Sequence, residues 1–244
     1  MPPFTVVCNC RLSQAHIKLL RIHPNNLQLT IRQIFDSLIN MSWIDSFMPD
    51  YLRISLRARV EPTVKHITKN LNNGRLTAVD ENSGELVVSE LARQSIVSEY
   101  HYLDIPIGEL IATQAAQNPG FDFYSMNLDD VLLFGESKYI AATTAHNSAL
   151  KQIVDFRNNK KDDKDLITVN PFIPQDRKVA FQNYCNGQKG YIAAFASKNE
   201  SNDELINKLE RNKYFKQLVD CTELICVAID LSLIHISEPT RHLR

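Results

Sequence analysis

The pattern of apolar and polar residues predicts a β-hairpin in the middle of the chain, with a helix on each side of it. The apolar runs FDFYS (121–125) and VLLFGESKY (131–139) are too short for helices and are separated by the turn-forming residues MNLDD. In residues 84–99 and 145–157 the apolar positions recur with helical spacing. Helix, hairpin and helix are therefore expected in succession.

The rest of the second half continues this alternation. Its order of elements is typical of a mixed α/β domain, in which helices flank a central mixed sheet. The expected elements are a helix after Pro106 (107–117), a charged surface loop (158–165), a helix near 176–185, a strand YIAAFAS (191–197), an amphipathic helix (202–218) and a strand TELICVAID (222–230).

The first 80 residues follow a less regular pattern. Residues 17–38 contain apolar positions of helical or mixed type, whereas YLRISLRARVEP (51–62) alternates apolar and polar residues and predicts a half-buried strand. Arg53, Arg57 and Arg59 would then form a row on one face of this strand. Such a row either follows the phosphate backbone of a nucleic acid or is an ordinary solvated surface.

The turn-rich segment 72–85 is the best domain boundary that the pattern offers. It separates a smaller N-terminal region (1–80), with possible DNA or partner contacts, from the main domain (81–230). Residues 231–241, LSLIHISEPTR, are identified as a translated sequencing adapter, so residues 231–244 are expected to be read-through without a role.

Composition narrows the classes of protein without naming a function. A formal net charge of −1 argues against a polybasic protein, and 44% hydrophobic residues provide for a substantial core. An odd number of cysteines, five, favours reduced thiols in the cytoplasm. No segment reaches the length of a membrane span. A zinc site from Cys8, Cys10 and His16 is less favoured than simple packing because paired CxxC spacing is missing.

Charged residues at one end of the predicted hairpin suggest chemistry. Asp122 lies at the start of the first strand, while Glu136 and Lys138 lie at the end of the second and, two apart, share a face. Two neighbouring carboxylates repel each other unless a cation separates them, and their hard oxygen atoms favour Mg²⁺ or Mn²⁺. The amine would stabilise a phosphate or align water. The alternative is a surface ion pair at a strand edge.

This arrangement resembles the PD-(D/E)xK nuclease superfamily, over about residues 84–230. The resemblance implies a restriction-endonuclease-like core, with Asp122, Glu136 and the Ser137 carbonyl as metal ligands and Lys138 as the catalytic lysine. It also implies a glutamate on the first helix and a glutamine on the helix after the hairpin. Glu90 and Gln152 match these positions best, and Glu109 and Glu85 are alternatives to Glu90.

Several longer sequence segments resemble the C-terminal domain of HamA, the nuclease subunit of the Hachiman anti-phage defence system. They are GELVVSELARQSIV, IPIGELI, NPGFDFYS, LLFGESKYIA and GYIAAFAS. This resemblance implies a Mg²⁺-dependent deoxyribonuclease that works with a helicase partner in bacterial defence. A restriction- or repair-type nuclease, and a non-catalytic nucleic-acid-binding adaptor subunit, remain alternatives.

Overall fold

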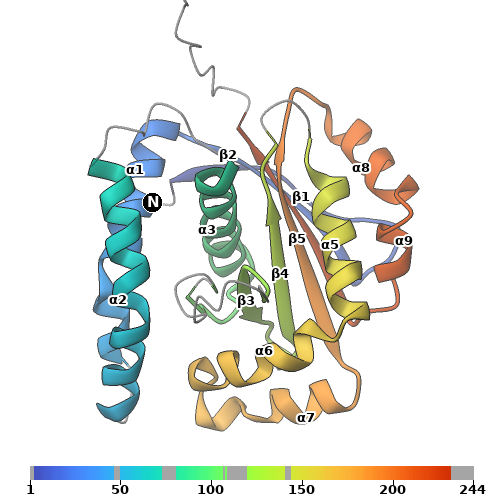
Figure 1. Ribbon diagram of the computed structural model, residues 1–244. Helices are drawn as coiled ribbons and strands as arrows, with labels where there is room; N and C mark the ends of the chain where they lie inside the picture. The colour runs from blue at the N-terminus through green and yellow to red at the C-terminus, as the bar shows by residue number, and fades with distance from the viewer. Residues whose placement is uncertain are drawn as a thin grey trace, which may run out of the picture.

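Six strands form one mixed sheet at the centre of the computed structural model (Figure 1). The structure describes residues 3–46, 50–72, 81–106, 108, 120–140 and 144–231. The strands are β1 (Phe4–Arg11), β2 (Ile17–Pro24), β3 (Phe123–Met126), β4 (Leu132–Lys138), β5 (Lys189–Ser197) and β6 (Glu223–Asp230).

Their spatial order is β1-β2-β6-β5-β4-β3. The four inner strands run parallel to their neighbours, and β1 and β3 are paired antiparallel at the two edges. Because the inner strands are parallel, the C-terminal ends of β4, β5, β6 and β2 lie together at one end of the sheet. Lys138, the last residue of β4, lies there. The predicted hairpin and the two later strands are confirmed.

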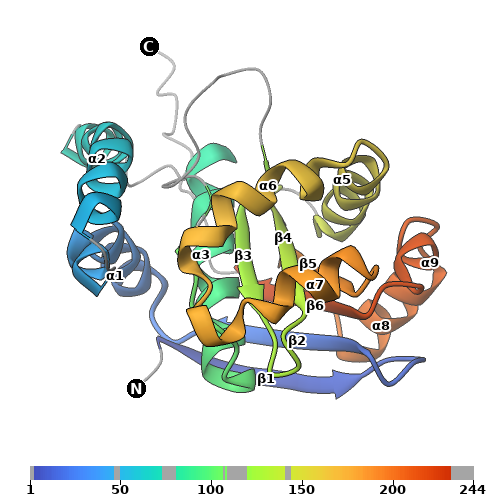
Figure 2. The same cartoon turned by 90° about the horizontal axis from the view of Figure 1, so that it is seen from below.

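Helices cover both faces of this sheet (Figures 1 and 2). Helix α3 packs on one face against β3, β4, β5 and β6, and α5 packs on the other against β4 and β5. Helices α1 and α2 lie outside α3, whereas α6 and α7 lie below the sheet in Figure 1. The bounds are α1 Leu27–Ile39, α2 Asp50–Asn72, α3 Glu81–Tyr100, α5 His146–Asn158, α6 Lys161–Val169, α7 Val179–Cys185, α8 Asn202–Arg211 and α9 Phe215–Leu218, with short 3-10 turns at Met41–Ser46, Asn170–Phe172 and Gln175–Arg177.

The central strands are apolar on both sides because each face is covered by helices. Residues Leu224–Ile229 of β6 are completely buried, and so are Tyr191–Ala196 of β5. The alanines of β5 leave room for close approach of the flanking helices. This continuous apolar pattern is typical of parallel strands within an α/β core.

The predicted strand over 51–62 is wrong, because these residues belong to helix α2. Its buried residues Leu56, Val60 and Val64 recur every four positions, which is helical spacing that the alternation of polar residues concealed. Pro62 lies within the helix instead of ending the element.

The predicted row of three arginines on one strand face is also wrong, because the segment is helical. Arg53 and Arg57, four positions apart, share a helix side, but Arg59 lies about 200° around the axis from Arg57. Arg53 forms an ion pair with Asp50 of its own helix, and Arg57 with Asp45, at 3.0 Å. The three side chains therefore do not form one row.

The segment 158–165 is also corrected, because a surface loop was expected and α6 begins there at Lys161. Two of its aspartates, Asp162 and Asp165, are buried. Their burial could not be predicted from the run of charged residues, because composition does not indicate which carboxylates accept hydrogen bonds in the folded chain. The predicted helix 202–218 is divided into α8 and α9.

The N-terminal residues contribute to the same sheet as the main domain, since β2 pairs with β6. The predicted helix after Pro106 lies outside the described residues except for Gly108. Of residues 231–244, the structure describes Leu231, which is buried. Within the described part of the chain, no helix has the length and apolar character needed to cross a membrane.

Candidate functional site

The hairpin brings Asp122 close to Glu136. Phe123 pairs with Gly135 and Tyr124 with Phe134, and a regular continuation of this ladder would set Asp122 opposite Glu136. The backbone N–H of Asp122 donates to the Gly135 carbonyl at 2.9 Å, one position out of this register, so the ladder is irregular just before β3. The two carboxylates are close enough for the charge of Asp122 to raise the pKa of Glu136.

Glu136 is completely buried, yet few hydrogen-bond donors surround its carboxylate. Its Oε1 lies 3.0 Å from the Lys138 Nζ as an ion pair. Among the described residues, neither carboxylate oxygen accepts a hydrogen bond of good geometry. Burial and the nearby charge of Asp122 raise the pKa of Glu136 well above its usual range, against the opposing effect of Lys138.

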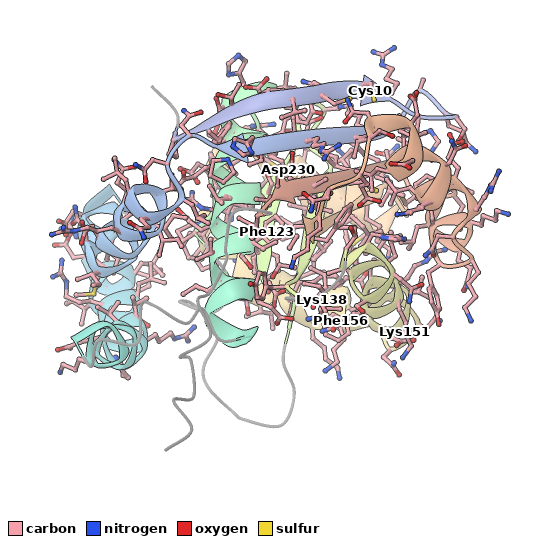
Figure 3. All side chains as sticks on the ribbon, turned by 90° about the horizontal axis from the view of Figure 1, so that it is seen from above. Cys10, Phe123, Lys138, Lys151, Phe156 and Asp230 are labelled. Carbon is pink, nitrogen blue, oxygen red and sulfur yellow. The ribbon has the colours of Figure 1, made fainter. Side chains whose placement is uncertain are left out.

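Lys138 joins the hairpin to α3. Its Nζ lies 3.1 Å from Oε1 of Glu85, and the side chain is 17% exposed. Figure 3 shows Lys138 in the space between α3 and α5. Burial lowers the pKa of Lys138, but the charges of Glu136, Asp122 and Glu85 more than offset this and raise it overall. The amine is therefore a fixed cation at neutral pH.

Asp122 is held by Ser137, the residue between Glu136 and Lys138. The backbone N–H and the Oγ of Ser137 both donate to Asp122 Oδ2, each at 2.8 Å. Ser89 of α3 donates to the same Ser137 Oγ at 2.7 Å. Burial raises the pKa of Asp122, and the hydrogen bond from the Ser137 N–H and the charge of Lys138 work against that shift. Oδ2 is therefore engaged, and the Asp122 side chain also interacts with that of Glu136.

The backbone of Ser137 faces the same side as these groups. The N–H and C=O of a strand residue point in one direction, and the Ser137 N–H points to Asp122. Its carbonyl is thus turned towards the chain just before the start of β3, where the ladder has stopped. This position suits the role of a third oxygen ligand.

The glutamate that α3 brings to this site is Glu85. Glu90 is buried but accepts hydrogen bonds from Arg93, at 2.6 and 2.8 Å, and from Gln94, at 2.8 Å. Five positions along a helix correspond to about 140° of rotation, so Glu90 cannot share the face of Glu85. The four-residue spacing of Glu85 and Ser89 is the sequence signal for this face, because both contact residues of β4.

The remaining predicted residues are Gln152, Glu109 and the three arginines of α2. Within the described part of the chain, no hydrogen bond joins the half-buried Gln152 of α5 to Asp122, Glu136 or Lys138. Glu109 lies outside the described residues. Arg53, Arg57 and Arg59 lie on α2, which Figure 2 shows beyond α3.

The oxygens gathered here are those that Mg²⁺ or Mn²⁺ prefers. Glu136, Asp122, the Ser137 carbonyl and Glu85 could hold such an ion, although Lys138 now bridges two of these carboxylates. Across the described ranges, no three His, Cys, Asp or Glu side chains are already assembled as a metal site. Cys8 and Cys10 lie 3.3 Å apart at their sulfur atoms, but His16 binds the Val219 carbonyl instead.

No known protein-family model matches this chain, and no curated protein matches it either.

Proposed function

We propose that the protein is a metal-dependent nuclease that hydrolyses DNA phosphodiester bonds at the end of the β3–β4 hairpin. The observation that carries this proposal is the buried carboxylate of Glu136, which faces Asp122 and has Lys138 as its cationic neighbour. A buried carboxylate with one ion pair, and with no well-formed hydrogen bond from the described residues, is costly to the fold, and a ligand that supplies positive charge would lower this cost. The order of α3, hairpin, α5 and β5 is also that of the superfamily which the sequence resembles.

A divalent cation fits the residues that are present. Glu136 and Asp122 would hold it, with the Ser137 carbonyl and Glu85 completing a set of oxygen ligands. When bound, such an ion polarises a phosphoryl oxygen and lowers the pKa of bound water. The unsatisfied oxygens of Glu136 are the feature of this chain that fits such an ion.

The side chains of the chain itself would bind and orient the substrate. Lys138 is protonated and close to both carboxylates, so it can pair with a phosphate oxygen and stabilise the charge that develops there. Glu85 restrains the lysine from the α3 side. The two Ser137 donors and Ser89 fix Asp122 in one rotamer, which reduces reorganisation during the reaction.

The choice of DNA, a helicase partner and a role in anti-phage defence rest on the resemblance to HamA. Restriction- or repair-type nucleases share the same core motif, so they are the second form of this proposal. Both forms make the same demand on Asp122, Glu136 and Lys138.

The test is cleavage of labelled duplex DNA, single-stranded DNA and RNA by the full chain with Mg²⁺ or Mn²⁺. Glu136→Gln and Lys138→Met are each expected to slow cleavage on the order of 10²–10³-fold, because each removes charge from the site. Excess chelator should abolish it. Equal rates for Glu136→Gln and the unaltered protein, or full activity in chelator, would contradict the proposal.

Two glutamates of one helix provide the matched comparison. Glu85→Gln should reduce cleavage, since Glu85 contacts Lys138, whereas Glu90→Gln should retain it, since Glu90 faces Arg93. Circular dichroism at the assay temperature establishes that both variants are folded. The reverse outcome would return Glu90 to the site that the sequence resemblance assigned to it.

A further inference from the structure

Asp165 of α6 is a buried carboxylate that contacts the segment carrying Asp122. It is 8% exposed, and its Oδ2 accepts two hydrogen bonds. One comes from the backbone N–H of Phe121 and the other from the hydroxyl of Tyr124, both at 2.9 Å. These donors lie one residue before Asp122 and two residues after it. A single oxygen atom therefore fixes the chain on both sides of Asp122.

The local sequence is adapted to this contact. Phe121 precedes β3, and its N–H donates to the carboxyl group of Asp165. A Cβ atom at position 120 would lie 2.6 Å from Asp165 Oδ1, so glycine is needed for the carboxylate to come this close. The Phe121 ring packs against Phe134 and Phe156 with centroid distances of 5.4 and 5.2 Å. Side chain and backbone are both anchored just before Asp122.

A second aspartate of the same helix serves a different part of the sheet. Asp162 is completely buried and accepts from the Tyr191 hydroxyl at 2.9 Å and from Lys189, both residues of β5. Asp162 and Asp165 thus have the same kind of partner, a buried tyrosine of a strand. They differ in one respect that matters, because only Asp165 holds the backbone next to Asp122.

We propose that Asp165 is a positioning residue, which orients Asp122 towards Glu136 by holding the Phe121 N–H and the Tyr124 hydroxyl. This inference rests on the proposed metal-dependent nuclease. Among the described residues, no hydrogen bond joins Asp165 to Asp122 or Glu136, so its effect passes through the backbone of the hairpin. Outer partners of metal ligands commonly change metal affinity when they are removed, even though they touch no metal.

The test measures Mn²⁺ binding to the full chain by calorimetry, together with kcat and KM for DNA cleavage. Asp165→Ala should raise the Kd for Mn²⁺ by about 10–100-fold and lower kcat at limiting metal, with KM for DNA unchanged. Asp165→Asn should restore both values, because the amide oxygen can accept the same two hydrogen bonds. Asp162→Ala is the matched control, expected to lower stability while leaving Mn²⁺ affinity as it was.

Each outcome separates the two proposals. If the unaltered protein binds Mn²⁺ and Glu136→Gln does not, the metal site is supported. The positioning role is then overturned if Asp165→Ala binds Mn²⁺ as tightly as the unaltered protein. It is also overturned if Asp165→Ala and Asp162→Ala lose the same amount of Mn²⁺ affinity. If the unaltered protein and Glu136→Gln are alike in failing to bind Mn²⁺ and to cleave, the proposed function fails and the positioning role with it. Should Asp165→Ala not fold, Tyr124→Phe decides: weaker Mn²⁺ binding than in Tyr191→Phe supports the role, and unchanged binding overturns it.

Discussion

Two glutamates of the central sheet are buried beside a lysine, and their surroundings differ. Glu223, at the start of β6, is 4% exposed and accepts from Lys18 and from the Tyr102 hydroxyl through Oε1, each at 2.6 Å. Its Oε2 accepts from Asn127 at 2.8 Å. Glu136, near the end of β4, is completely buried with a lysine at 3.0 Å, but no described residue donates a well-formed hydrogen bond to it.

The difference separates a structural carboxylate from one that is suited to bind a ligand. At Glu223 a lysine, a tyrosine and an amide replace the water that both oxygens lose on burial, and they connect β2, β6 and the β3–β4 turn. At Glu136 the desolvation cost is offset only in part. A fold that keeps such a group at the end of a hairpin, opposite a second carboxylate, leaves a place for a cation.

The largest expected effect is on stability, from truncation of the satisfied glutamate. Glu223→Ala leaves Lys18, Tyr102 and Asn127 without their common acceptor, which should cost about 3–5 kcal/mol of unfolding free energy. Urea denaturation followed by circular dichroism measures the loss. Glu136→Ala should cost far less, because that carboxylate has few favourable contacts to lose. Equal losses for the two variants would remove the distinction between these sites.

The surroundings of Glu136, at the hairpin, could largely be predicted from the sequence, whereas those of Glu223 could not. The strands 121–125 and 131–139 are separated by obvious turn residues, so the approach of Asp122 to Glu136 follows from local pattern and register. The Glu223 network could not be predicted, because its partners Lys18, Tyr102 and Asn127 come from three distant segments that only the folded sheet brings together.

Three predictions were wrong or incomplete because they depended on contacts outside the local sequence window. Residues 51–62 alternate like a strand, but Leu56, Val60 and Val64 show the helical spacing once the window extends beyond Pro62. Glu85 and Glu90 are the same residue type on one helix, and their assignment depends on which side of α3 meets β4. Asp165 looked like one charge in a solvated run, because its donors, Phe121 and Tyr124, lie more than forty positions earlier in the chain.

A smaller effect of opposite sign is expected at the other glutamate. Glu136→Gln removes an unfavourable buried charge and should stabilise the metal-free protein by roughly 1–3 kcal/mol at alkaline pH. The folded protein raises the pKa of Glu136 above the ordinary value of 4.5, so it binds this proton more tightly than the unfolded chain does. The resulting stability is complete below about pH 4.5 and is lost as the pH rises through the raised pKa.

The measurement is unfolding free energy as a function of pH for the unaltered protein and Glu136→Gln in chelator. The two curves should meet at low pH and separate as the pH rises, with the variant more stable. Asp122 and Lys138 interact with Glu136, so the difference between the curves reports the charge of Glu136 together with its coupling to these two groups. Curves that separate in the opposite direction would mean that Glu136 is stabilised as an anion.

The smallest effect is the one that a bound ion contributes directly. An ion that binds the folded chain alone stabilises it by an amount that depends on its concentration relative to Kd, about 1.4 kcal/mol at ten times Kd. Mg²⁺ should therefore raise the melting temperature of the unaltered protein and of Glu223→Gln, in which the site is intact. It should have no effect on Glu136→Gln beyond that of an equal ionic strength of NaCl, because the charge that attracts the ion is gone. A Mg²⁺-dependent rise of the same size in Glu136→Gln would place the binding site elsewhere, and Glu136 would then be an unsatisfied carboxylate without a ligand.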